Sequence, residues 1–264
     1  MKTHSPESRD VKQTVEHHFS QVAANYRTSQ VHAAGVDLEQ MVLAARLSGR
    51  EVVLDAGCGA GHTALAFAPH VARVIAYDLS APMLEQVAEM AEERGLANVE
   101  IQRGDVENLP FEDGMFDIVT TRYSAHHWPN PQRALSQFRR VLKQGPTSRG
   151  QLLLSDVVSS DDFALDTFIQ SIELLRDISH VRDHTPTQWM AMLSGAGFTA
   201  ELVYQWDLRL DFSSWVERMA TPADAVAVIC ALFDRAPEDV RSALRLEADY
   251  SFTFRGALLR GVGQ

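Results

Sequence analysis

Three glycines follow an apolar run, and a carboxylate ends the next apolar run. The stretch EVVLDAGCGAGHTALAFAPHVARVIAYDLS, residues 51–80, holds Gly57, Gly59, Gly61 and Asp78. Glycine removes the side chain where a backbone bends sharply or approaches a ligand closely. A carboxylate such as that of Asp78 can accept two hydrogen bonds from a cis-diol. The spacing therefore predicts a loop shaped around a ligand, and which ligand it is must be decided from further motifs.

Two common nucleotide-binding loops match this stretch poorly. The dinucleotide fingerprint G-x-G-x-x-G requires a third glycine at position 62, where His62 stands, because Gly61 falls one place early. A triphosphate-binding loop requires Gly-Lys-Ser/Thr after the glycines, and GAGHTA contains no lysine. An NAD-dependent oxidoreductase is therefore the weaker alternative.

The motifs resemble those of another family. The pattern D-x-G-x-G-x-G, formed by Asp55, Gly57, Gly59 and Gly61, resembles motif I of the class I S-adenosylmethionine-dependent methyltransferases. The stretch FDIVTTRYSAHHW is similar to the region that shapes the methionine end of the cofactor in the ubiquinone/menaquinone C-methyltransferase-like subgroup (methyltransferase type 11). VLKQG resembles the V-L-K-P-G-G of the family, with Gln144 in place of proline. These motifs cover roughly residues 50 to 160.

The resemblance implies S-adenosylmethionine as cofactor and S-adenosylhomocysteine as product. It assigns Asp78 to the two ribose hydroxyls and Asp105 to the adenine amine. Four further residues complete the implied cofactor-binding set, namely Leu79, Met83, Val106 and Arg122. The sulfonium of this cofactor is cationic and carries no phosphate, which agrees with a glycine loop that lacks lysine.

The N-terminal segment FSQVAANYRTSQVHAAG resembles the helix that closes over the cofactor in this subgroup. Tyr26, Ser29 and His32 correspond to positions in that lid, and Tyr26 and His32 are expected to contact the cofactor. The alternative, an ordinary helix surface, stays open.

His126 and His127 are the candidates for proton transfer. A neutral imidazole could accept a proton as the methyl group arrives. Transfer to an atom that is already nucleophilic depends mainly on holding the pair in line, so a base can be unnecessary. Cys58 is expected to be a small buried residue rather than a nucleophile. The spacing of His180 and His184 is only loosely metal-like, and no metal site is expected.

Alternating segments must position these residues. Five segments have the length and composition of strands in a parallel sheet: 51–57, 73–80, 99–105, 116–123 and 150–158. Three helical segments separate them, namely 62–72, 81–96 and 130–145, and Ser80 is the expected N-cap of the second. This α/β pattern predicts a doubly wound, Rossmann-like sheet with helices on both faces.

The C-terminal third predicts two strands, 199–212 and 251–263, around a helical insertion, as in a hairpin that carries a cap. The resemblance implies seven strands with the last antiparallel. We expect one methyltransferase domain over 1–264: a helical lid (1–48), the cofactor-binding core (49–160), and the substrate-side helices with the last two strands (161–264). Six aromatic residues in the last part are expected in the core: Phe163, Phe168, Trp189, Trp206, Phe212 and Trp215.

Composition limits the partners. The 264 residues include 24 Lys and Arg against 35 Asp and Glu, a formal charge of -11 that disfavours nucleic acid. The region TTRYSAHH also differs from the motifs of nucleic-acid methyltransferases. No apolar run of about 18 residues could span a bilayer, and two cysteines form no disulfide framework. We expect a soluble cytoplasmic protein, and a homodimer stays open.

The expected function is methyl transfer from S-adenosylmethionine to a small molecule. The acceptor atom, carbon, oxygen or nitrogen, is unresolved. A non-catalytic regulatory protein that binds S-adenosylmethionine is the second alternative, because binding motifs do not guarantee turnover.

Overall fold

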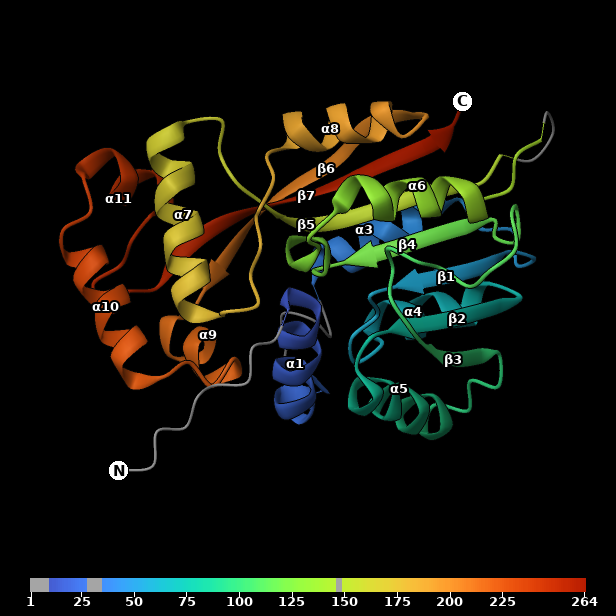
Figure 1. Cartoon of the computed structure of the whole chain (residues 1–264), viewed down its shortest axis with the longest axis horizontal. Helices are drawn as coiled ribbons and strands as arrows, with labels where there is room; N and C mark the ends of the chain where they lie inside the picture. The colour runs from blue at the N-terminus through green and yellow to red at the C-terminus, as the bar shows by residue number, and fades with distance from the viewer. Residues whose placement is uncertain (1–9, 28–34, 146–148) are drawn as a thin grey trace.

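The computed structural model describes residues 10–27, 35–145 and 149–264 and contains a seven-stranded sheet (Figure 1). The strands are β1 (Val52–Ala56), β2 (Arg73–Asp78), β3 (Val99–Arg103), β4 (Ile118–Arg122), β5 (Gln151–Val158), β6 (Phe198–Leu210) and β7 (Phe252–Gly263). Their spatial order is β3-β2-β1-β4-β5-β7-β6, and β7 pairs antiparallel with both β5 and β6. The predicted sheet with an antiparallel last strand is confirmed.

Helices cover both faces of the sheet. They are α1 (Val11–Arg27), α3 (Val36–Ala45), α4 (His62–Phe67), α5 (Ala81–Glu93), α6 (Pro131–Val141), α7 (Phe163–Arg176), α8 (Pro186–Gly195), α9 (Phe212–Arg218), α10 (Ala223–Asp234) and α11 (Glu238–Leu244). Short 3-10 turns, η1 (Ala68–His70) and η2 (Ala125–His127), follow α4 and β4. In the described chain, no helix is long and apolar enough to cross a membrane.

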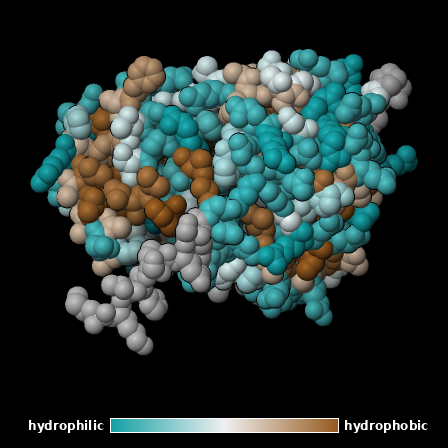
Figure 2. Space-filling model, in the orientation of Figure 1, coloured by the Kyte–Doolittle hydropathy of each residue, from teal (hydrophilic) through white to brown (hydrophobic). Residues whose placement is uncertain are grey.

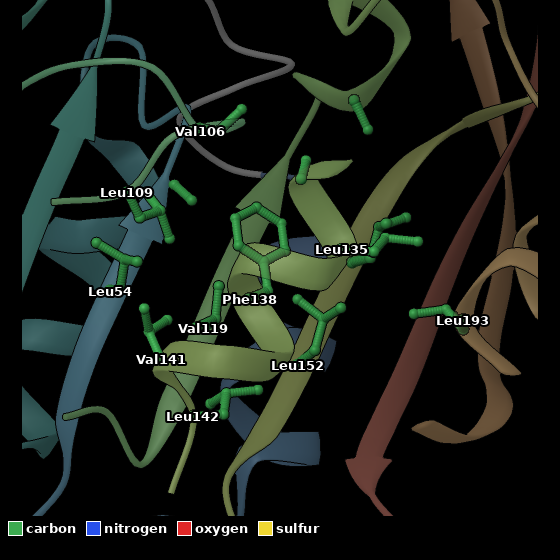
Figure 3. Close-up of a cluster of buried hydrophobic side chains, with 14 of the residues drawn as sticks. Leu54, Val106, Leu109, Val119, Leu135, Phe138, Val141, Leu142, Leu152 and Leu193 are labelled. Carbon is green, nitrogen blue, oxygen red and sulfur yellow. The ribbon is translucent and has the colours of Figure 1, made fainter. Parts of the chain in front are cut away.

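Alternate residues of each strand build a separate core on each face of the sheet. Leu54 of β1 packs with Phe138 of α6 and Trp189 of α8, and Figure 3 shows α6 side chains against this face. The next residue back, Val53, packs on the other face with Phe67 of α4. This alternation follows from the two-residue period of a strand and explains why the central strands are apolar throughout.

Local signals place the helix ends where the sequence indicates. Ser80 accepts a hydrogen bond from the Met83 amide and caps α5, and Gly95 follows this helix with a φ of 65°. Thr185 and Gln188 form a capping box at the start of α8.

The long strands β6 and β7 carry the helical insertion away from the central sheet. Figure 1 shows α7, α9, α10 and α11 gathered around their far end. These helices share a core that includes Trp215, Phe233 and Phe252, so the predicted hairpin with a helical cap is confirmed. Figure 2 shows hydrophobic residues gathered on the surface of this part.

The prediction that six aromatic side chains of the C-terminal part lie in the core is mostly correct. Four of the six side chains are buried, namely Trp189, Trp206, Phe212 and Trp215, and Phe168 packs at the edge of the insertion core. The prediction for Phe163 is wrong, because its side chain is 86% exposed. Phe163 is the first residue of α7, where the helix has not yet reached the core.

Candidate active site

A large cavity opens at the carboxyl ends of the central strands. It encloses about 950 Å³ including its opening, and its wall contains the glycine loop and the ends of β2, β3 and β4. The strand order reverses between β1 and β4, and open α/β sheets bind ligands at such a switch point. Helix α1 lies across the cavity and contributes Lys12, Val15, Glu16 and Phe19 to its wall (Figure 1).

The glycine loop adopts a backbone that disfavours side chains. Gly57 has a φ of 71°, and a Cβ atom there would lie 2.1 Å from Ser124 Oγ. Gly61 has a φ of 85°, and its Cβ would lie 2.6 Å from Val87 of α5. Gly57 and Gly59 line the cavity, whereas Gly61 does not. The third glycine therefore permits close packing of the loop on α5.

Asp55 stabilises this loop from the interior of the protein. Its carboxylate accepts hydrogen bonds from the Ala64 amide at 2.9 Å and the Thr120 hydroxyl at 3.0 Å, and it does not line the cavity. Burial raises the pKa of Asp55 to about 7, against the lowering effect of these two hydrogen bonds. Asp55 thus holds the start of α4 to β4, and any effect on a ligand acts through the loop.

Asp78 presents a fixed carboxylate to the cavity. Oδ2 accepts a hydrogen bond from the Gly59 amide and Oδ1 accepts one from the Ser80 amide, each at 2.9 Å. Burial raises the pKa of Asp78, and the two backbone donors oppose this shift. Each oxygen keeps a further lone pair. The group could therefore accept both hydroxyls of a ribose, with Leu79 and Met83 beside it in the wall.

A partly buried ion-pair cluster joins α1 to the loop after β3. Lys12 Nζ lies 2.6 Å from both Asp105 Oδ2 and Glu107 Oε2. Burial lowers the pKa of Lys12, but the two carboxylates overcome this effect and raise it. Asp105 and Val106 line the cavity as predicted. Sequence analysis missed Lys12 and Glu107, because more than 90 residues separate the lysine from its partners.

Arg122 and Tyr123 form the wall at the end of β4. The Arg122 guanidinium makes a buried ion pair with Asp37 of α3, in which Nη2 donates to Oδ1 at 3.1 Å. Tyr123, beneath the guanidinium, has a φ of 49°. Such backbone strain in a non-glycine residue is typical of functional sites.

His127 lies in the cavity wall, where its ring meets Phe19 edge to face. Its Nδ1 lies 3.1 Å from the carbonyl oxygen of Ser179, which can only accept, so Nδ1 carries the proton. Burial and the charge on His126 lower the pKa of His127 to about 4. The ring is therefore neutral near pH 7, with an unprotonated Nε2 that can accept a hydrogen bond.

His126 has the opposite charge state and does not line this cavity. Its Nδ1 lies 2.7 Å from Asp156 Oδ1. Burial lowers its pKa, but Asp156, with smaller contributions from Asp183 and Glu173, outweighs burial and raises it to about 9. A protonated imidazole cannot accept a proton, so of the two adjacent histidines only His127 is in a state to do so.

The remaining predicted residues fall into three groups. Tyr26 lies in α1, but its side chain, like Ser29 and His32, lies outside the described residues. Cys58 lines the cavity, and burial raises the pKa of its thiol. Within the described ranges, His180 and His184 belong to no group of three or more potential metal ligands. Sequence analysis also did not single out the cavity residues Phe19, Ser124 and Trp128, although each lies in a stretch that carries the resemblance.

The fold and the cavity define an α/β protein with a candidate ligand site at the carboxyl ends of its parallel strands, and comparison with known proteins identifies its family. Residues 54–147 match the family model described as a methyltransferase domain. The chain is 37% identical over 249 residues to the uncharacterized methyltransferase YcgJ of Bacillus subtilis, covering 92% of this chain and 97% of that protein. The crystal structure of YcgJ has a TM-score of 0.82 at 36% identity, covering 86% of this chain and 98% of that one.

A second relative supports the same assignment. The uncharacterized protein YafE of Escherichia coli is 41% identical over 197 residues, which cover 75% of this chain and 93% of that protein. This chain therefore belongs to the class I S-adenosylmethionine-dependent methyltransferases.

Proposed function

We propose that this methyltransferase transfers the methyl group of S-adenosylmethionine to a small-molecule acceptor and releases S-adenosylhomocysteine. The observation that carries the proposal is the Asp78 carboxylate, which two backbone amides hold at the cavity wall. When bound, S-adenosylmethionine supplies an electrophilic methyl group on a positively charged sulfur. The cavity wall also carries the carboxylates of Glu16, Asp105 and Glu107, which suit a cation rather than a polyphosphate.

The residues present fit the parts of this cofactor. Asp78 would accept the ribose hydroxyls, and Asp105 with Val106 would face the adenine. Leu79 and Met83 offer apolar contact, since they line the wall beside Asp78. Gly57 and Gly59 leave room for the methionine portion, and Arg122 lies at that end. Asp55, Gly61, Tyr26 and His32 are proposed to act through the loop and the lid.

Finer assignments belong to the same proposal. The FDIVTTRYSAHHW stretch supports a place near the ubiquinone/menaquinone C-methyltransferase-like subgroup. The acidic composition supports a small-molecule acceptor rather than nucleic acid, and a cytoplasmic location.

The test is calorimetric titration with S-adenosylmethionine, S-adenosylhomocysteine and NAD. We expect the two sulfur nucleosides to bind in the micromolar range, and Asp78→Ala to weaken both at least about tenfold, because hydrogen bonds to a charged group are lost. The exposed Glu112 provides the matched control, Glu112→Ala, which should bind as the unmodified protein does. Melting temperatures show whether Asp78→Ala is folded. Binding of NAD alone would contradict the proposal.

A non-catalytic binding protein is the remaining alternative. A screen of acceptors with S-adenosylmethionine labelled in the methyl group separates the two functions. Transfer that Asp78→Ala abolishes supports an enzyme, whereas tight binding without transfer to any acceptor favours the regulatory alternative.

A further inference from the structure

A second, smaller cavity lies behind His127. It encloses about 530 Å³ including its opening, and it is lined by the turn after β4, by α7 and α9, and by the end of β6. Tyr123 and His127 line both cavities. A molecule in the smaller cavity would therefore lie next to the proposed methionine end of the cofactor. We call this smaller space the polar cavity, because most of its lining residues are charged or polar.

Most charged groups in the polar cavity already have partners. Arg176 Nη1 donates to Glu173 Oε2 at 3.2 Å, and its Nε donates to the Trp215 carbonyl at 3.0 Å. His126 pairs with Asp156. These contacts satisfy the requirement that buried charges be paired. They also leave the cavity with cations and anions in similar number, so its charge does not select a strongly ionic ligand.

Asp183 is the exception. It lines the polar cavity and is only 2% exposed. Its backbone is fixed, since the amide of Asp183 donates to Gln170 Oε1 and its carbonyl accepts from Gln170 Nε2. Its Oδ2 has no hydrogen-bond partner among the residues that the structure describes. A buried oxygen without a partner is rare and costs stability, which indicates a place for a ligand donor.

His127 supplies a second acceptor in this space. Because Nδ1 donates to Ser179, the lone pair of the ring is on Nε2. Nε2 lies 4.0 Å from Asp177 Oδ2, beyond hydrogen-bonding distance. A hydrogen-bond donor of a ligand could therefore bind to Nε2 at the boundary between the two cavities.

We propose that the polar cavity binds the methyl acceptor, a small neutral molecule with a hydroxyl group that donates to His127 Nε2 and a second donor that reaches Asp183. This inference rests on the proposed function. The acceptor oxygen forms the new bond to the methyl carbon while the bond from that carbon to the cofactor sulfur breaks, and the bonding pair stays on sulfur. The hydroxyl proton passes to Nε2, so the products are a methyl ether, a neutral thioether and a protonated imidazole.

The charge state of His127 favours a hydroxyl over an amine. Burial lowers the pKa of His127 to about 4, so it is too weak a base to deprotonate an alkylammonium ion. A hydroxyl proton becomes strongly acidic as the oxygen acquires the methyl group, and even a weak base then accepts it.

The experiment uses the full chain saturated with S-adenosylhomocysteine and labelled with ¹⁵N in histidine. Two pairs of probes, 1,2-benzenedimethanol with 1,2-bis(aminomethyl)benzene and ethylene glycol with ethylenediamine, are titrated while the His127 Nε2 resonance is observed. We expect the hydroxyl member of at least one pair to shift this resonance, and its amine partner to bind about tenfold more weakly or not at all. Equal binding of the amines, or no response to either hydroxyl probe, would overturn the inference.

Two variants test the named residues. Asp183→Leu should weaken hydroxyl binding about tenfold without lowering the melting temperature, because the burial of this carboxyl, whose Oδ2 has no hydrogen-bond partner among the described residues, outweighs its attraction to His126. A lower melting temperature, or unchanged binding, would show that the carboxyl is structural. His127→Gln should abolish methyl transfer to the responding hydroxyl probe, and retained transfer would exclude His127 as the base. The controls are Asp224→Leu and His70→Gln, both at exposed positions.

Cofactor binding separates the two proposals. If S-adenosylhomocysteine fails to bind the unmodified chain, the proposed function fails. If it binds and Asp78→Ala abolishes binding, while the hydroxyl probes never reach His127, only the polar-cavity inference fails.

Discussion

At the scale of single residues, surroundings rather than residue type assign the roles. Asp55 and Asp78 end neighbouring parallel strands, yet only Asp78 lines the cavity. Asp55 is turned to the start of α4 and keeps its loop in place. Asp78 accepts two amide hydrogen bonds that fix its carboxylate for a ligand. Any loss of cofactor affinity in Asp55→Ala would therefore come with loss of stability.

The pair of His126 and Asp156 predicts how stability depends on pH. The folded pKa of His126 is raised to about 9, since Asp156 outweighs burial. Its stabilisation is therefore complete below about pH 6.5 and is lost as the pH rises through about 9. We expect the free energy of unfolding in urea to fall by about 2–3 kcal/mol between pH 7 and pH 10. Asp156→Asn should show no such fall, and a His126→Gln curve with the same fall would contradict this assignment.

At the scale of elements, helix α1 connects the cofactor-binding core to the helical insertion. Lys12 holds it to the loop after β3, Ser20 contacts Ser80 at the start of α5, and His18 Nε2 lies 3.1 Å from the Met219 carbonyl after α9. Because Lys12 pairs with Asp105, the proposed partner of adenine, α1 lies directly beside the proposed adenine site. We propose that the helix, which forms part of the cavity wall, also acts as the predicted lid.

Two ion pairs of α1 provide a matched comparison. The Lys12 cluster includes Glu107, whose side chain is 2% exposed, whereas Arg103 and Glu16 are paired at the surface. We expect Lys12→Met to speed proteolytic cleavage of α1 at least about tenfold, because the buried Glu107 carboxylate loses its cation and keeps only its hydrogen bonds from Asn130. Arg103→Met should change the rate less than about threefold, since exposed pairs contribute little. Equal effects of the two variants would show that burial does not decide how α1 is held.

At the scale of the whole molecule, the hairpin of β6 and β7 connects the cofactor-binding core to the helical insertion. Residues 255–262 of β7 pair with β5, whereas Phe252 at the start of β7 belongs to the core of the helical insertion. The polar cavity lies at this junction, since α7, α9 and β6 meet the turn after β4 there. The proposed acceptor site therefore depends on how the hairpin holds the insertion.

The two strands of this hairpin are in close contact at Gly256. It pairs with Trp206 across the strands, and a Cβ atom at this position would lie 2.2 Å from the indole ring. We expect Gly256→Ala to lower the free energy of unfolding in urea by about 1–3 kcal/mol, because Trp206 is buried and must shift. Gly195→Ala, at an exposed helix end with no atom near its Cβ, should cause no loss. Unchanged stability of Gly256→Ala would show that the hairpin tolerates movement of the indole.

The amino-acid sequence by itself determined the features that follow from local chemistry. The strands can be recognised from their apolar composition and length alone, without knowledge of the strands that pair with them. The loop after β1 can be recognised because its backbone angles require glycine. Ser80 and Thr185 cap their helices through atoms only three residues away. The position of Asp78 at the cavity could be predicted, because the last residue of β2 lies at the carboxyl-terminal edge of the sheet.

Only the tertiary structure decided the contacts between distant segments. Lys12 reaches Glu107 across 95 positions, and His127 donates to Ser179 across 52. His126 and His127 are identical neighbours in the sequence, but the 3-10 turn sends one toward Asp156 and the other into the cavity wall, so burial and partner charge move their pKa values apart. That Asp183 Oδ2 has no hydrogen-bond partner among the described residues is likewise apparent only when the chain is folded, since a missing partner depends on every residue around it.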